Sequence, residues 1–120
     1  MMSEIQFKNG NGRFSEAVIH SGIIYTSGIV GDTPGADASL QTKEILAHFD
    51  RILAENHSDR KHILDLTVII PDIRKNVNVV GDIINAWVNQ DALPARFTYQ
   101  GLLVSPLWNV EISMRAAQKS

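Results

Sequence analysis

The sequence contains no cysteine, which excludes a disulfide framework, a thiol nucleophile and a thiolate metal site. Basic residues are not in excess: 11 Lys and Arg against 13 Asp and Glu give a formal net charge of −2. This balance argues against nucleic acid or an anionic membrane as the main partner. No segment approaches the roughly 20 apolar residues that a membrane-spanning helix needs, and the N-terminus lacks the apolar core of a signal peptide. We therefore expect a cytoplasmic location.

Several common catalytic motifs are missing as well. Gly28, Gly31 and Gly35 fit neither GxGxxG nor the Walker spacing, and no Lys-Ser/Thr pair follows them. There is no GxSxG, which argues against a serine hydrolase. The histidines form no HxH or HExxH pair, so a structural or surface role is favoured over metal binding; they are His20, His48, His57 and His62.

The pattern of apolar and polar residues predicts a single domain over residues 1–120 with the order β-β-β-α-β-α-β-β. Strands are expected at 5–8, 16–20, 23–26 and 63–70, helices at about 37–56 and 75–89, and two more strands between 94 and 117. The second helix has poor propensity, so packing must hold it, and its Gly81 is interpreted as a close approach to the sheet. This order indicates an α+β fold in which two helices cover one face of a mixed six-stranded sheet. The other face would be an apolar patch, which predicts association.

The segment from Pro94 to Ala117 carries the most informative pair of charged residues. Arg96 begins one predicted strand and Glu111 lies in the next, and the two strands are interpreted as a β-hairpin. Alternation places Val110, Ile112 and Met114 on one face of the second strand, opposite Glu111, Ser113 and Arg115. One interpretation is a structural cross-strand ion pair. The other is a guanidinium that binds a carboxylate, beside a carboxylate that moves protons or orients water.

This segment also resembles a known family. Pro94-Ala95-Arg96, followed after a gap by Val110-Glu111-Ile112, is similar to the C-terminal signature of the RidA/YjgF family. The resemblance covers about Gly12 to Ala117 through three further motifs: Tyr25-Thr26-Ser27-Gly28, Gln41-Thr42 and Thr67-Val68-Ile69. A YoaB-like branch is indicated by Arg13-Phe14-Ser15-Glu16, Val18-Ile19-His20 and Ala86-Trp87-Val88.

The resemblance implies a RidA-like, chorismate-mutase-like fold and a homotrimer with active sites between subunits. It also implies that Arg96 binds the substrate carboxylate and that Glu111 positions or activates water. Backbone groups of Gly28 and Thr98 would line the pocket. No metal or organic cofactor is expected, because the carbon of an iminium group is already electrophilic.

Three positions depart from the family pattern. Phe14 stands where many members have tyrosine, Ile29 where they have glutamine, and Val80 where they have asparagine. All three are predicted to be substrate-binding residues, and each departure removes a polar group. We therefore expect an apolar pocket that prefers imines of apolar amino acids.

The predicted function is an enamine/imine deaminase, a hydrolase of the 2-iminobutanoate/2-iminopropanoate deaminase type. It would convert reactive 2-imino acids to 2-keto acids and ammonia. The alternative is a non-catalytic trimeric module that binds small carboxylic or 2-keto acids. A ribonuclease is disfavoured by the net negative charge and the lack of a basic stripe.

Overall fold

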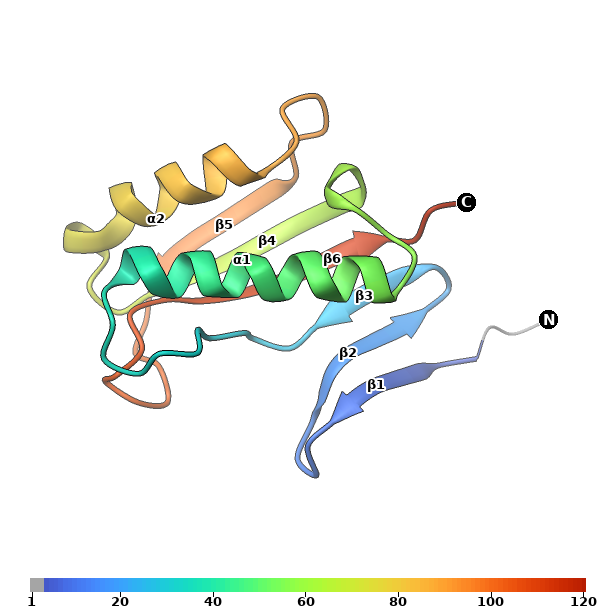
Figure 1. Ribbon diagram of the computed structural model, residues 1–120, viewed down its shortest axis with the longest axis horizontal. Coiled ribbons are helices and arrows are strands. Elements are labelled where there is room, and N and C mark those ends of the chain that lie inside the picture. Colours follow the sequence, from blue (N-terminus) through green and yellow to red (C-terminus); the bar gives the residue numbers. More distant parts are fainter. Residues whose placement is uncertain (1–3) are drawn as a thin grey trace.

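The computed structural model describes residues 4–120 as one layer of helices on one sheet (Figure 1). The predicted element order is confirmed, with a short 3₁₀ helix, η1, before the fourth strand. The elements are β1 (Gln6–Gly10), β2 (Ser15–His20), β3 (Ile23–Thr26), α1 (Ala38–Glu55), η1 (Arg60–His62), β4 (Ile63–Ile70), α2 (Ile73–Trp87), β5 (Ala95–Gln100) and β6 (Glu111–Ala117). No helix among these residues is long and apolar enough to cross a membrane.

The six strands form one mixed sheet in the order β1-β2-β3-β6-β4-β5. Only β4 and β5 are parallel, and all other neighbours are antiparallel. The predicted hairpin between the last two strands is wrong, because β4 lies between β5 and β6. The helix α2 carries the chain from the end of β4 back to its start, so β5 must run parallel to β4. The long connection at 101–110 then lets β6 pair with the other edge of β4.

The hydrophobic core lies between the sheet and the two helices. Val110, Ile112 and Met114 point into it and are almost fully buried, as their alternation predicted. From α1 the core receives Ile45, Leu46, Phe49, Ile52 and Leu53, and from α2 it receives Val80, Ile84 and Trp87. Burial of these side chains holds α2 in place despite its weak propensity.

The face of the sheet away from the helices is uncovered in one chain and carries large aromatic side chains. Phe97 is 64% exposed, and Tyr25 and Tyr99 are also exposed. The strand register pairs Phe97 with Thr67, Tyr25 with Arg115, and Tyr99 with Ile69. The side chains of Thr67, Arg115 and Ile69 lie on the face opposite the core. The predicted uncovered face is therefore present, and we call it the open face.

The expectation for Gly81 is wrong. A Cβ atom added at this position would meet no heavy atom within 4 Å, so Gly81 does not mark a close approach of α2 to the sheet. Close approaches of backbone to side chain occur instead at Gly28 and Gly31. At Gly31 an added Cβ would lie 2.7 Å from Glu44 Oε1, which shows how closely this loop lies on α1.

Candidate active site

The carboxyl group of Glu111 lies directly against the backbone of Gly28. A Cβ atom at Gly28 would be 2.6 Å from Glu111 Oε2 and 2.7 Å from its Cδ, so only glycine leaves room for the carboxyl group. Two backbone hydrogen bonds fix this contact: the Ile29 N–H donates to the Ile112 carbonyl (2.8 Å), and the Ile112 N–H donates to the Ile29 carbonyl (3.0 Å). The segment after β3 is thereby joined to the start of β6.

Burial raises the pKa of Glu111, and no ion pair or hydrogen bond within residues 4–120 offsets this effect. A half-buried carboxylate without a charged partner holds protons more strongly than a solvated one. A raised pKa brings such a group closer to the range in which a general base is most effective. Glu111 is therefore suited to accept a proton from water.

The guanidinium of Arg96 also lacks a carboxylate partner within the described part of the chain. Burial lowers the pKa of Arg96, but an arginine stays charged at neutral pH. Arg96 borders a cavity of about 340 Å³ that is lined also by Asp65, Leu66, Thr67, Ala95, Phe97 and Arg115. The register pairs Arg96 with core-facing Leu66, so its side chain leaves β5 on the side of the helices. An uncompensated, forked donor is suited to bind a carboxylate with two hydrogen bonds.

Arg96 and Glu111 do not form the cross-strand ion pair that was one interpretation of the sequence. Arg96 pairs with Leu66 on one edge of β4, and Glu111 pairs with Ile69 on the other edge. At about 3.3 Å per residue and about 4.8 Å between strands, their Cα atoms lie roughly 14 Å apart. Leu66 faces the core and Ile69 faces away from it, so the side chains of Arg96 and Glu111 leave the sheet on opposite faces and one small ligand cannot contact both within a single chain.

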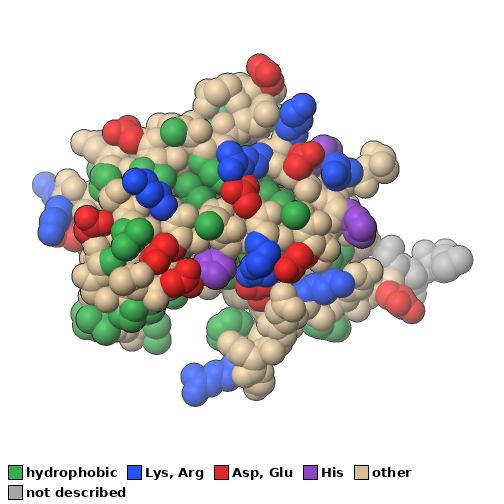
Figure 2. Space-filling view, viewed as in Figure 1, with side chains coloured by type: hydrophobic (Ala, Val, Ile, Leu, Met, Phe, Trp, Pro, Cys, Tyr) green, Lys and Arg blue, Asp and Glu red, His purple; other side chains and the backbone are tan. Residues whose placement is uncertain are grey.

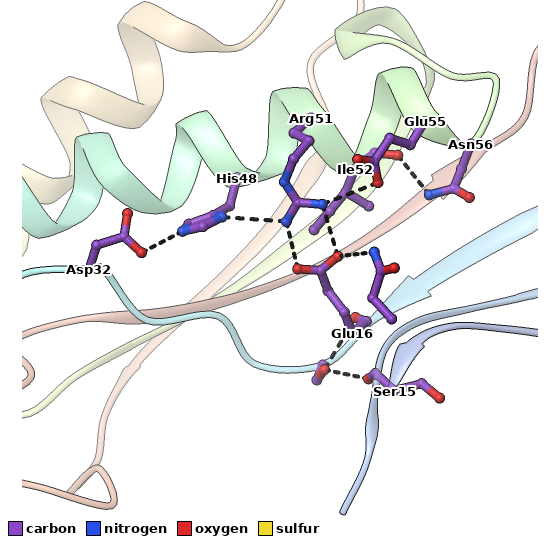
Figure 3. Close-up of polar contacts among 10 residues, drawn as sticks. Ser15, Glu16, Asp32, His48, Arg51, Ile52, Glu55 and Asn56 are labelled. Atoms are coloured by element: carbon purple, nitrogen blue, oxygen red, sulfur yellow. Dashed lines mark hydrogen bonds and ion pairs between the residues drawn. The ribbon is translucent and has the colours of Figure 1, made fainter. Parts of the chain in front are cut away.

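An ion-pair network ties β2 to α1 near Gly28 (Figure 3). Arg51 donates to both carboxylate oxygens of Glu16 (2.6 and 3.1 Å) and to Glu55 (3.1 Å). The Glu16 carbonyl in turn accepts from the N–H and the hydroxyl of Ser27, the residue before Gly28. Glu16 of β2 and Arg51 of α1 thus hold this part of the candidate site in place.

The loop after Gly28 is anchored to the same helix. His48 Nε2 lies 2.7 Å from Asp32 Oδ1, and Glu44 accepts hydrogen bonds from the backbone of Asp32 and from both the backbone and the hydroxyl of Thr33. The chain on both sides of Gly28 is thus fixed to α1, which limits movement of the backbone against which Glu111 lies.

The remaining predicted site residues are scattered. Thr98 is exposed on the edge strand β5, and Ile29 is half-buried beside Ile112. Phe14 is exposed just before β2. Val80 is only 1% exposed and belongs to the core, so it offers no surface to a ligand. These positions do not line the cavity that holds Arg96.

Two polar residues of the cavity, Asp65 and Arg115, were not predicted as site residues. They are far apart in sequence, and only the pairing of β4 with β6 places them opposite one another. The available signal was that Arg115 shares a face of its strand with Glu111.

Comparison with known proteins decides the family. The family model described as "Endoribonuclease L-PSP" matches residues 7–118. The chain belongs to the RidA/YjgF family. It is 34% identical to a RutC family protein of Haemophilus ducreyi over 98% of this chain and 97% of that protein. It is 35% identical to RutC family protein YoaB of Escherichia coli K12, over 88% of this chain and 90% of that protein.

A solved structure of another RidA/YjgF protein shares the fold. The crystal structure of a YjgF family member from Neisseria meningitidis has a TM-score of 0.92 and 34% sequence identity. The match covers 98% of this chain and 97% of that one. The arrangement of six strands and two helices is therefore that of this family.

The Glu16–Arg51 pair predicts a pH dependence of stability. The hydrogen bond from Arg51 is the largest cause that lowers the pKa of Glu16, so the pair stabilises the fold fully only above the unfolded-state pKa of about 4.5. Glu16→Gln should lower the free energy of unfolding by roughly 0.5–1 kcal/mol at pH 7. The difference in the free energy of unfolding between wild type and Glu16→Gln should shrink as the pH falls from 4.5 through the lowered pKa of Glu16. Urea unfolding at pH 3 to 7 measures it, and an equal difference at every pH would contradict this role.

Substitution of Gly28 should displace Glu111 without unfolding the chain. The Cβ atom of Gly28→Ala meets the end of a flexible side chain, so the carboxyl group moves at small cost in stability. A misplacement of about 1 Å can lower a catalysed rate roughly 100-fold. The kcat of the imine hydrolysis expected from the sequence should therefore fall on the order of 10- to 100-fold.

Steady-state kinetics and thermal unfolding of Gly28→Ala test this expectation. Gly81→Ala is the matched control, since its Cβ meets nothing and alanine favours a helix by roughly 0.5–1 kcal/mol. Full activity of Gly28→Ala despite a displaced Glu111 would show that the contact has no catalytic importance.

Proposed function

We propose that this protein hydrolyses reactive 2-imino acids to 2-keto acids and ammonia. The observation that carries the proposal is a pair of uncompensated charged groups: Arg96 on the edge strand β5 and half-buried Glu111 against Gly28. Uncompensated burial of ionisable groups disfavours folding and is found disproportionately at functional sites. Family membership supports the same reaction class.

The reaction needs one anchor and one proton-handling group. Arg96 holds the substrate carboxylate and so fixes the position of the adjacent C=N carbon. Glu111 takes a proton from water as the water oxygen bonds to this carbon and the C=N π electrons move to nitrogen. The nitrogen gains protons, ammonia leaves, and loss of the last hydroxyl proton forms the keto group. The overall balance is imino acid plus water to keto acid plus ammonia.

The placement of Arg96 and Glu111 supports a site formed by two chains. Because their side chains leave the sheet of one chain on opposite faces, Arg96 of one copy would act with Glu111 of another. The open face, with its exposed aromatic side chains, offers the surface for this association. The proposed assembly is a homotrimer with three equivalent sites, as the family resemblance implies.

The alternative function is a trimeric binding module for small carboxylic or 2-keto acids. The same Arg96 would bind the ligand, and Glu111 would have no chemical role. Keto-acid release distinguishes the two functions. An amino-acid oxidase or a threonine dehydratase generates the imine in the presence of this protein, and the rate of keto-acid appearance is compared with the spontaneous rate.

Ribonuclease activity, named in the description of the family model, has little physical support in this chain. Lys and Arg side chains are interspersed with Asp and Glu on the helical face (Figure 2). Arg51, Arg60 and Arg115 are each paired with a carboxylate. Binding of an RNA backbone instead needs a basic surface that neutralises several phosphates.

Substitutions of Arg96 test the anchor. Arg96→Ala removes the charge and the fork, whereas Arg96→Lys keeps the charge and loses the bidentate geometry. Both variants should lose roughly 10- to 100-fold in kcat/KM while their mass by light scattering and thermal unfolding stay close to wild type. Unchanged kcat/KM in Arg96→Ala would show that Arg96 does not bind the substrate.

Mixing two inactive variants tests whether the site lies between chains. Arg96→Ala and Glu111→Gln are each expected to be inactive, but hybrid trimers would contain one intact Arg96–Glu111 pair. After unfolding and refolding of an equal mixture, about a quarter of wild-type activity should return if subunits assemble at random. Each variant refolded alone is the control. Active single variants or no recovery in stable hybrid trimers would contradict the shared site.

A further inference from the structure

A groove between α1 and α2 lies on the surface of the molecule opposite the open face. Its volume is about 330 Å³, at the lower end of the range found for small-molecule sites. Apolar side chains are visible between charged ones on this helical face (Figure 2). The groove is lined by Lys43, Leu46, Ala47, Asp50, Arg60, Ile83, Ala86 and Trp87. Association through the open face would leave it accessible.

A hydrogen-bonded cluster from three elements closes one end of the groove. Arg60 of η1 donates to both carboxylate oxygens of Asp50 on α1 (2.8 and 2.7 Å) and to the backbone carbonyl of Trp87 on α2 (3.1 Å). The indole N–H of Trp87 also donates to Asp50 (3.1 Å). The Cζ atom of Arg60 lies over the indole ring, 4.8 Å from its centroid. The guanidinium is thus held in a fixed plane.

The face of this guanidinium that points away from the indole is available to a ligand. The side chain of Arg60 is 44% exposed although all of these contacts are made. A guanidinium is planar, weakly hydrated and stacks well on aromatic rings. A second ring can therefore stack on Arg60 and extend the arrangement that Trp87 begins.

Lys43 gives the groove its charge. It lies two turns before Asp50 on α1, roughly 10 Å along the helix axis. Its ammonium group forms no ion pair within residues 4–120. Because Asp50 and Arg60 neutralise each other, the net charge of the lining residues is +1. Between the two ends the walls are apolar, and the small side chains of Ala47 and Ala86 leave room there.

We propose that this groove is a binding site for an arylalkyl carboxylate, a molecule with an aromatic ring and a carboxylate at opposite ends of a short apolar chain. The ring stacks on Arg60, the chain lies along the apolar walls, and the carboxylate pairs with Lys43. Burial of the ring and chain supplies most of the affinity, and Lys43 selects the sign of the charge. The site uses neither Arg96 nor Glu111 and is separate from the proposed reaction.

Other classes of small molecule complement the groove less well. A cationic ligand would approach Lys43, and like charges repel. Asp50 does not compensate, because its oxygens already accept three hydrogen bonds from Arg60 and Trp87. An alkyl carboxylate has no ring to stack on Arg60, and a neutral aryl compound gains nothing from the ammonium group.

Tryptophan fluorescence measures occupancy of the groove. The chain has two tryptophans, so Trp87 is the only one left in a Trp108→Phe background. Titration of this protein with 4-phenylbutanoate should change the Trp87 emission to saturation. The amine 4-phenylbutylamine, with the same ring and chain, should bind roughly fivefold or more weakly, because an attraction at Lys43 becomes a repulsion. Hexanoate, which lacks the ring, should also bind more weakly.

Three substitutions in the same background locate the site. Lys43→Met should weaken 4-phenylbutanoate roughly two- to fivefold and remove its advantage over the amine. Lys75→Met, at an exposed lysine of α2 outside the groove, is the matched control and should change neither. Ala47→Phe places a ring in the groove from an exposed position and should abolish binding without loss of thermal stability.

Arg96→Ala separates this site from the proposed active site, and it should bind 4-phenylbutanoate as tightly as the Trp108→Phe parent. Equal affinities for the acid and the amine, or full binding by Ala47→Phe, would overturn the inference. So would a Trp87 signal that follows protein concentration and ignores the ligand, since a second copy would then fill the groove. None of these results bears on imine hydrolysis, and absence of imine hydrolysis would leave the groove site standing.

Discussion

The insertion of β6 between β3 and β4 is the constraint on which the rest of the structure depends. It buries Val110, Ile112 and Met114 against the helices and so turns the alternate residues of the strand toward the open face. Its first residue, Glu111, then meets Gly28 after β3, and Arg115 lies opposite Asp65 on β4. One strand therefore supplies both a central part of the core and the candidate base.

The distribution of charge separates structural groups from functional ones. Arg51, Arg60 and Arg115 each hold a carboxylate, which offsets the loss of hydration on partial burial. Arg96 and Glu111 have no such partner within residues 4–120. Burial lowers the pKa of Arg96 and raises the pKa of Glu111, and both changes favour the neutral form of the group. A fold that pairs these three arginines and leaves Arg96 and Glu111 unpaired sacrifices stability at those two positions.

Local patterns predicted the elements well, because periodicity and turn residues act over a few residues. They failed for the partner of β5, since the pairing of strands depends on where a helix returns the chain. Asp65 and Arg115 escaped detection for the same reason. Val80 is instructive in another way: family likeness placed it in the pocket, whereas in the structure it is buried in the core on α2.

The open face carries exposed aromatic side chains together with the Asp65–Arg115 pair, and the proposed association would cover both. Asp65 and Arg115 neutralise each other, which lets a second copy approach this surface without burying a net charge. Arg96 has no such partner, so its charge is balanced only when an anion binds. A substrate carboxylate would therefore satisfy a group that the chain itself leaves unsatisfied, and binding would stabilise the assembled site. In this arrangement the stability lost at Arg96 is recovered only in the complex, which favours occupancy by carboxylates over neutral compounds of similar size.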